Sequence, residues 1–405
     1  MKEKLYLKSI LSEFKEKYDY PLFKKVLNAS RRDVVNEIKK SKLRGRGGAG
    51  FPTYKKLEYV FDKDNVHFIV NADEGEPGTF KDRFIIEKNP NHLLEGLLIL
   101  AYAVEAKNLY IYIRGEYKEA IHKLEKAIQY LNTIKETFNY SFDISLVKGA
   151  GAYVCGDETS LINSIEGKRP NSRIKPPYPT EEGLYGYPTV VNNVETIANV
   201  PLIIRDGGET YAKIGTSEST GTKLVCLSGR IEKAGVYEIE FGSLTMRELI
   251  FDLGKGIKNG NKFAFVIPGG ISTCVLTDTE LDVSLDYESL KEIGTSFGSG
   301  AVIVGDEQVD IVSVARNVSD FFMNETCGMC YPCKEGNRQI HHLLSEIDKG
   351  IGTFEYLDLI REISNTTSIT ARCGLGQSAG NFITCASEKF REQFLRKMKV
   401  GDPID

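Results

Sequence analysis

Hydrophobic positions in the first half of the chain alternate between helical spacing and short strand-like runs. Helical spacing dominates residues 1–43, where Ser30 is a predicted N-cap, and it returns in the apolar run 93–106 and the amphipathic segment 116–131. Short β-branched runs bounded by polar turns predict strands at 67–71, 109–113 and 143–147. Strands that alternate with helices of this length predict an α/β layer around a parallel sheet.

The pattern changes in the second half. From about residue 222, short apolar runs between Gly and Pro turns predict a small α+β domain, with strands at 223–228, 235–239 and 263–267 and a helix at 245–253. From about residue 306, helical spacing predicts a terminal bundle, with helices at 312–323, 336–347, 354–363 and 378–398. The predicted divisions are a helical segment, an α/β domain, an α+β domain and a bundle, at 1–43, 44–221, 222–305 and 306–405.

Composition narrows the class of protein. The 405 residues are 41% hydrophobic and 27% charged, as in ordinary globular proteins, and the net charge of −4 argues against nucleic-acid binding. The N-terminus has charges of both signs and no apolar signal core, and the run 93–106 is too short to span a bilayer. Eight cysteines are too sparse for a disulfide scaffold, and their clustering favours metal ligation in a reducing compartment. We therefore expect a cytoplasmic protein.

The cysteine cluster is the most specific chemical feature. Cys327, Cys330 and Cys333 are each separated by two residues, and Cys373 follows about forty residues later. This spacing is typical of a 4Fe–4S cluster, which carries single electrons. Structural zinc is the alternative, although zinc sites usually pair two C-x2-C motifs or add histidines. The remaining cysteines, Cys155, Cys226, Cys274 and Cys385, are expected to be small core residues.

A first glycine-rich loop matches G-x-G-x-x-G at Gly45, Gly47 and Gly50. A Rossmann turn requires a strand immediately before the motif, but residues 41–44 continue a helix, so an ordinary Rossmann turn is not expected. Glycines still allow a flat ring or a phosphate to approach the backbone, and Arg44 and Arg46 could pair with phosphate. A flexible surface loop is the alternative.

Other polar loops follow predicted strands. Residues 71–78 form an acidic loop after a buried strand, where carboxylates could accept ribose hydroxyls and disfavour a 2′-phosphate; a solvated turn is the alternative. A second glycine loop, 149–156, precedes a helix at whose N-terminus Asp157 and Glu158 are either caps or ribose ligands. The segment 168–179 is stiff and basic, and the amides within 190–196 could read the edge of a flavin or nicotinamide.

In this order, the motifs closely resemble the flavoprotein (51 kDa-type) subunit of respiratory complex I and the related diaphorase subunits of NAD-linked hydrogenases and formate dehydrogenases. The segments that carry the resemblance are 45–53, 71–83, 149–167, 175–179, 190–196, 327–336 and 373–376. The resemblance implies a Rossmann-like FMN-binding α/β domain, a ubiquitin-like (soluble-ligand-binding) β-grasp domain and a C-terminal four-helix bundle that holds a 4Fe–4S cluster.

The resemblance also implies site residues. FMN would be held by the first glycine loop with Lys56, by the acidic loop and by the asparagine pair, while NADH would stack on aromatic side chains and bind carboxylates. The matching cofactor positions are Gly45, Arg46, Gly47, Gly48, Ala49, Gly50, Phe51, Lys56, Tyr59, Asn71, Asp73, Glu74, Glu76, Tyr153, Gly156, Asp157, Glu158, Lys175, Tyr178, Asn192, Asn193 and Thr196. The matching cluster ligands are Cys327, Cys330, Cys333 and Cys373.

The implied activity is hydride transfer between NAD(H) and FMN, followed by one-electron transfer through the cluster to partner subunits. No residue is expected to act as a catalytic acid or base, because hydride is the moving species. Expected partners are a thioredoxin-like 2Fe–2S subunit and a larger iron–sulfur or catalytic subunit, with ferredoxin as a further candidate. Tyr59 and Tyr178 replace phenylalanines common in the family, and Asp157 replaces a glutamate. Residues 372–376 are closer to the hydrogenase and formate dehydrogenase form, so an NAD(P)-linked subunit of an electron-bifurcating hydrogenase, formate dehydrogenase or transhydrogenase is the alternative to complex I.

Overall fold

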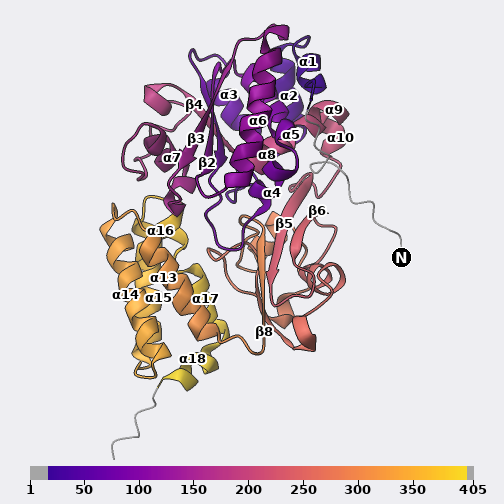
Figure 1. Cartoon of the computed structure of the whole chain (residues 1–405). Coiled ribbons are helices and arrows are strands. Elements are labelled where there is room, and N and C mark those ends of the chain that lie inside the picture. The colour runs from indigo at the N-terminus through magenta and orange to yellow at the C-terminus, as the bar shows by residue number, and fades with distance from the viewer. Residues whose placement is uncertain (1–16, 399–405) are drawn as a thin grey trace, which may run out of the picture.

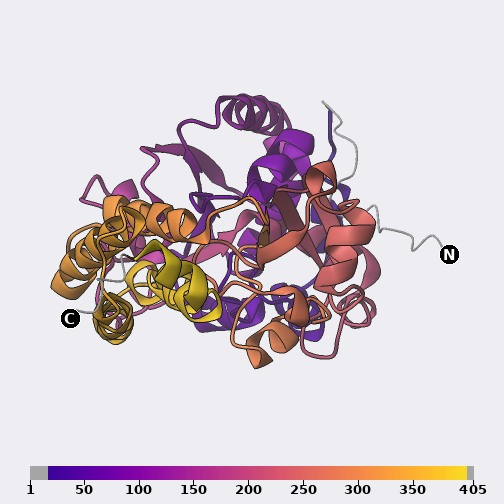
Figure 2. The same ribbon diagram turned by 90° about the horizontal axis from the view of Figure 1, so that it is seen from below.

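The computed structural model describes residues 17–398, and its parts follow one another along the chain (Figure 1). An α/β part lies above a second sheet and a helical bundle, and the view from below shows the bundle and the second sheet side by side (Figure 2). Residues 1–16 of the predicted N-terminal helical segment and residues 399–405 of the predicted bundle lie outside the described residues. The remainder of that N-terminal segment is helical, as predicted.

The first sheet is parallel throughout, which confirms the predicted α/β layer. Its order is β3-β2-β1-β4, with strands β1 (His67–Ala72), β2 (Asn108–Arg114), β3 (Asp143–Gly149) and β4 (Thr189–Asn193). The helices of this part are α1 (Pro21–Val26), α2 (Arg31–Lys40), α3 (Thr53–Val60), α4 (Lys81–Lys88), α5 (Pro90–Ala103), α6 (Lys118–Ile134), α7 (Glu158–Ile165), α8 (Val194–Ala198), α9 (Val200–Asp206) and α10 (Gly208–Tyr211). Parallel strands end at one edge of their sheet, so the loops that follow β1, β3 and β4 are brought together there.

Helix α5 forms the centre of the largest core and is buried along almost its whole length, as its apolar sequence predicts. Its one carboxylate, Glu95, is also fully buried. The side chain accepts hydrogen bonds from the backbone N–H groups of Leu22 and Phe23 and from the Tyr18 hydroxyl. Glu95 therefore anchors the start of α1 to the core, since a buried carboxylate is tolerated when hydrogen bonds replace water.

The second sheet is mixed and has the order β6-β5-β8-β7. Its members are β5 (Thr222–Gly229), β6 (Gly235–Glu240), β7 (Phe263–Ile267) and β8 (Ala301–Asp306), with α11 (Met246–Glu248) and α12 (Tyr287–Glu292) beside them. The two central strands, β5 and β8, are parallel, and each pairs with its outer neighbour in antiparallel fashion. Strand β8 was not predicted because it is buried on both faces and shows no apolar–polar alternation.

The C-terminal part is helical, as predicted. It contains α13 (Ile311–Glu325), α14 (Tyr331–Asp348), α15 (Glu355–Thr370), α16 (Gly374–Ser378), α17 (Asn381–Lys389) and α18 (Arg391–Lys397). The predicted continuous helix over 378–398 is wrong, because Phe390 adopts φ −113° and ψ 29° and separates α17 from α18. Between residues 17 and 398, no helix has the length and apolar character required to cross a bilayer.

Candidate functional site

The predicted loops meet at the carboxyl edge of the first sheet. The acidic loop follows β1, the second glycine loop follows β3, and Asn192 and Asn193 end β4. Strands β1 and β4 are adjacent, with Asn71 opposite Asn193 across the ladder. The side chain of Asn71 donates to the carbonyl of Gly156 at 2.9 Å, and this bond joins the acidic loop to the second glycine loop. The three loops therefore form one continuous polar rim.

The first glycine loop reaches this rim without a preceding strand, which confirms that it is not an ordinary Rossmann turn. The loop is closed at its base, where the Gly45 N–H donates to the carbonyl of Phe51 at 2.8 Å. Its middle is fixed to α8, because the Arg46 N–H donates to the Thr196 hydroxyl at 2.8 Å. A Cβ on Gly47 would lie 3.1 Å from the Cβ of Asn193, so glycine permits this close approach to the end of β4.

The structure gives the Arg46 side chain a different role from the expected phosphate pairing. Arg46 is fully buried, and its guanidinium donates to the carbonyls of Arg44, Thr220 and Thr222. A guanidinium already occupied by three carbonyls has no free edge for a bidentate phosphate contact. Arg46 instead ties the glycine loop to the start of β5, and the backbone of the loop remains as the surface for a ligand.

The two asparagines at the end of β4 differ in what they touch. The Asn193 amide is fully used by protein, since it accepts from Lys81 and from the Glu195 N–H and donates to Asp82. The Asn192 side-chain nitrogen is buried and has no hydrogen-bond partner. Asn192 is therefore the member of the pair whose amide is available to a ligand.

Asp73 has the same character on the other side of the rim. Both of its carboxylate oxygens are buried without a hydrogen-bond partner. Burial raises the pKa of Asp73 to about 7, even though Arg114 opposes this shift. Unsatisfied buried polar atoms are costly and usually mark a ligand site. Asp73 and Asn192 therefore fit a flat, polar-edged group such as the isoalloxazine ring, above a loop rich in glycine.

The carboxylates that follow in the acidic loop are engaged by protein, so the alternative of a solvated turn is wrong. Glu74 accepts from the N–H groups of Asp82 and Arg83 in the first turn of α4, and burial raises its pKa to about 7. Glu76 accepts from the backbone N–H and the hydroxyl of Ser272 in the second domain. Glu74 thus holds α4 in place, and Glu76 connects the acidic loop to the second domain.

A carboxylate between two lysines forms the second half of the site. Glu158, the first residue of α7, pairs with Lys56 of α3 at 2.9 Å and with Lys175 at 2.9 Å. Burial alone would raise the pKa of Glu158, but the two lysines outweigh it and lower the value to about 2. Asp157 caps α7 by accepting from the N–H groups of Thr159 and Ser160, which favours the capping alternative for that residue.

Three large aromatic side chains in this region are exposed. Phe51 precedes α3, Tyr59 lies on α3 beyond Lys56, and Tyr178 follows Lys175; their exposed fractions are 42%, 54% and 53%. Within residues 17–398, none of the aromatic ring pairs includes any of them. Exposed rings beside a buried carboxylate are suited to stacking against a ligand ring.

Tyr153, in the second glycine loop, lies between this site and the bundle. Its N–H donates to Glu325 at the end of α13, and its ring packs edge-on against Phe321 at 5.0 Å. Burial raises the pKa of its hydroxyl, and Glu76 and Cys373 add to this effect. A single side chain is therefore close to both the acidic loop and a predicted cluster ligand.

The four predicted cluster ligands lie together at one end of the bundle. Cys330 and Cys373 are the residues that precede α14 and α16, and Cys333 is buried in the first turn of α14. Burial raises the pKa of Cys333 to about 11, and the neighbouring thiols Cys373, Cys330 and Cys327 contribute. A Cβ on Gly376 would lie 2.9 Å from the Cys333 sulfur, so the backbone approaches this thiol closely.

The spacing of these thiols suits a multi-iron cluster. In the described part of the chain, no three His, Cys, Asp or Glu side chains converge closely enough to hold a single metal ion. In a 4Fe–4S cluster each thiolate binds a different iron, which allows the ligands to stand further apart. The Asn337 amide donates to the Cys333 sulfur at 3.5 Å, a contact of the kind that tunes such clusters.

The other cysteines divide into two pairs. Cys155 and Cys226 are buried free thiols, as predicted. Cys274 and Cys385, predicted to be core thiols, instead form a disulfide with a Cα–Cα distance of 5.5 Å. This bond joins the loop after β7 to α17, and residues 111 positions apart gave no sequence signal of their proximity.

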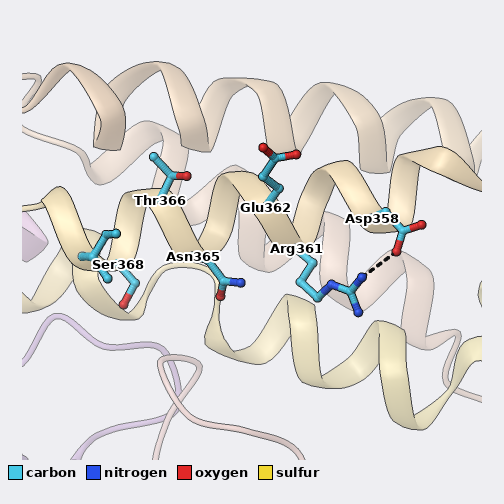
Figure 3. A pocket seen from close by; sticks show the side chains of 7 residues that line it. Asp358, Arg361, Glu362, Asn365, Thr366 and Ser368 are labelled. Carbon is cyan, nitrogen blue, oxygen red and sulfur yellow. Dashed lines mark hydrogen bonds and ion pairs between the residues drawn. The ribbon is translucent and has the colours of Figure 1, made fainter.

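A hollow along α15 lies apart from these sites. It is open and is lined by side chains of that helix alone (Figure 3). Asp358 and Arg361 form an ion pair within it at 2.8 Å. None of its lining residues belongs to the predicted cofactor or cluster positions.

Sequence reasoning missed the support that the second domain gives to the site. Lys223 of β5 and Ser272 of the loop after β7 both bond to residues of the rim or its loops. A lysine within an otherwise buried apolar strand was the one signal that could have pointed to Lys223.

Comparison with known proteins agrees with this geometry. A family model of the Nuo51 FMN-binding domain matches residues 38–202, and one of the NADH-ubiquinone oxidoreductase-F iron-sulfur binding region matches residues 313–397. An NADH-quinone oxidoreductase subunit of Aquifex aeolicus, the one designated F, is 44% identical over 97% of this chain and 93% of its own length. NADP-reducing hydrogenase subunit HndC of Solidesulfovibrio fructosivorans is 43% identical over 91% of this chain and 77% of its own length.

A solved structure shares the fold. The NAD+-reducing [NiFe]-hydrogenase in the H2-reduced state superposes with a TM-score of 0.88 at 32% identity, over 95% of this chain and 66% of that hydrogenase chain. Near-full-length identity to the Aquifex aeolicus protein and matches to both family models carry the assignment. The chain belongs to the family of FMN- and 4Fe–4S-binding flavoproteins that includes this NADH-quinone oxidoreductase subunit.

Proposed function

We propose that this chain is the electron-input subunit of a multi-subunit oxidoreductase, in which it exchanges hydride with NAD(H) and passes electrons singly to its cluster. One observation carries the proposal. The glycine loop, the unpartnered Asp73 and Asn192, and the lysine-flanked Glu158 share one sheet edge, and Tyr153 links this edge to the cluster cysteines. Bound FMN would supply the conversion between two-electron and one-electron chemistry.

The residues of the flavin half would bind and orient. The backbone of Gly45–Gly50 would lie against the cofactor, with Asn192 donating to it and Asp73 accepting from or donating to its polar edge. A pKa of about 7 allows Asp73 to be present in both protonation states at neutral pH. Asn193, Glu74 and Arg46 would act one step away, by holding these loops.

The residues of the nucleotide half would set specificity. Glu158 is ionised throughout the physiological range and would accept ribose hydroxyls, while Lys56 and Lys175 orient it and offset its charge. Phe51, Tyr59 and Tyr178 would stack on the nucleotide rings. A fixed carboxylate repels a 2′-phosphate, so NADH is the proposed substrate over NADPH.

The domain divisions support the same proposal. We assign the FMN domain to 44–221, a ubiquitin-like β-grasp domain to 222–305 and the cluster bundle to 306–405. The central parallel pair β5–β8, flanked by antiparallel strands, supports the β-grasp assignment. The partners we propose are a thioredoxin-like 2Fe–2S subunit and a larger iron–sulfur subunit, in a cytoplasmic complex.

An electron-bifurcating hydrogenase or formate dehydrogenase is the second candidate for the parent complex, with ferredoxin as a further partner. Two observations favour it: the similarity to the hydrogenase subunit HndC and the superposition on an NAD+-reducing hydrogenase. The identity to the NADH-quinone oxidoreductase subunit of Aquifex aeolicus is equally high and supports the first candidate.

Anaerobic purification and an NADH titration followed by an NADPH titration would test the proposal. We expect flavin absorbance near about 450 nm, bound iron, and bleaching by NADH in preference to NADPH. A purified chain that contains neither flavin nor iron would refute the main proposal, and bleaching by NADPH alone would overturn the choice of nucleotide.

A further inference from the structure

A fully buried lysine of the second sheet reaches the first glycine loop. Lys223 lies on β5 and has no exposed surface. Its ammonium group donates to the carbonyl of Arg46 at 3.2 Å, to the carboxylate of Glu195 at 2.7 Å and to the carbonyl of Ser299 at 3.1 Å. An ammonium group has three N–H donors, so its hydrogen-bonding capacity is completely used by these acceptors.

The lysine is one end of a buried chain of ion pairs. Glu195 also accepts from Lys81 at 3.0 Å, and Lys81 pairs with Asp82 at 2.7 Å. Asp82 then accepts from the amide of Asn193 at 2.6 Å, beside the unpartnered Asn192. Figure 1 shows β5, α4 and α8 meeting where the α/β part adjoins the second sheet. The network therefore spans both domains and ends at the flavin half of the site.

We propose that Lys223 is a positioning residue through which the second domain fixes the backbone of the flavin-binding glycine loop. The inference rests on the proposed placement of FMN against Gly45–Gly50. This loop needs outside anchors, because Gly48 and Gly50 have φ of +132° and +62° and glycine is conformationally free in the unliganded chain. Its anchors are Thr196 at the Arg46 N–H, Tyr287 at the Gly45 carbonyl and Lys223 at the Arg46 carbonyl.

Titration of Lys223 gives this role a signature that charge neutralisation of Glu195 alone does not. Burial lowers the pKa of Lys223 to about 8, although Glu195 opposes the shift. Above this pH the neutral amine has two N–H groups for three acceptors, so the hold on the loop weakens. The charged and titratable groups that face Lys223 are Arg46 of the loop, Lys81 of α4, Glu195 of α8 and Cys226 of β5.

The test uses the full chain with FMN and measures FMN dissociation by the recovery of flavin fluorescence. Lys223→Arg keeps the charge beside Glu195 and so preserves folding, but a planar guanidinium cannot reproduce three donors from one atom. We expect about tenfold weaker FMN binding, equivalent to about 1.4 kcal/mol. Wild-type affinity should also fall as the pH rises through about 8, and this step should be absent from the arginine variant, which does not titrate there.

Lys223→Met and Glu95→Gln complete the experiment. The methionine variant should bind FMN at least as weakly as the arginine variant. Glu95→Gln alters a buried carboxyl of α5 that bonds to the start of α1, and it controls for general loss of stability. FMN binding by Lys223→Arg that equals wild type, or a pH step that survives in it, would overturn the inference. Failure of wild type to bind FMN would instead refute the placement of FMN on which the inference rests.

Discussion

Glu158→Gln tests the nucleotide half of the site most directly. The Glu158 side chain is 25% exposed and is held between Lys56 and Lys175, each at 2.9 Å. The substitution keeps the shape of the side chain and removes its charge. If Glu158 accepts ribose hydroxyls, the variant should bind NADH more weakly while the transfer step is almost unchanged, because this carboxylate does not touch the reacting atoms.

The size of the effect follows from the surroundings of Glu158. A hydrogen bond to a charged group contributes about 1.5–3 kcal/mol. The partial exposure of Glu158 and the two lysines that share its charge place the value at the low end. About 1.5 kcal/mol corresponds to an increase of roughly tenfold in the KM for NADH. The kcat should stay within about twofold of wild type, since uniform binding energy is lost from the ground state and the transition state alike.

Initial rates of NADH oxidation with an artificial one-electron acceptor provide the assay. Glu166→Gln is a matched control, because Glu166 lies at the other end of α7 and also pairs with two cations, Lys168 and Arg173. The control should change the unfolding temperature and leave the KM as in wild type. An unchanged KM in Glu158→Gln, or a kcat that falls as much as kcat/KM, would refute the assigned role.

Other substitutions separate the remaining roles. Cys373→Ser should abolish the electron paramagnetic resonance signal of the reduced 4Fe–4S cluster and leave the flavin spectrum intact; retention of the cluster signal would contradict the ligand assignment. Asn192→Ala should weaken FMN binding about fivefold, whereas Asn193→Ala should chiefly lower thermal stability because it breaks the bond to Asp82; equal effects on FMN would count against this division. Asp73 titrates at about 7 in the folded chain and near 4 when unfolded, so stability of the FMN-free protein falls as the pH rises through that window. The unfolding temperature of Asp73→Asn relative to wild type should therefore increase from pH 5 to pH 8, and a constant difference would show that Asp73 is not the group responsible.

Local pattern predicted those parts of the site that depend on neighbours in the chain. The regular exchange of strand and helix spacing predicted the parallel sheet, and the carboxyl ends of its strands placed the acidic loop and the asparagine pair together. The helix before Gly45 correctly excluded a Rossmann turn. The spacing of Cys327, Cys330 and Cys333 depends on a few residues of chain, so it too could be read locally.

Which polar side chains face a ligand could not be read in this way. Arg46 and Glu74 both belong to motifs that match the family, yet one bonds to carbonyls of the second domain's first strand and the other holds α4. Asn192 and Asn193 are chemically identical neighbours, and only the surrounding helices determine which amide stays free. A side chain's role depends on which partners satisfy it after burial, and those partners lie far away in the chain.

The sequence by itself thus determined the layer order, the loops at the sheet edge and the ligand set of the cluster, because hydrophobic period and ligand spacing act over short distances. The tertiary structure alone decided that Lys223 reaches the glycine loop, that Ser272 holds Glu76 and that Cys274 joins Cys385. Each of these contacts joins segments separated by more than one hundred residues. Such contacts form because packing buries polar groups together, and each buried group must then find a hydrogen-bond partner wherever the fold provides one.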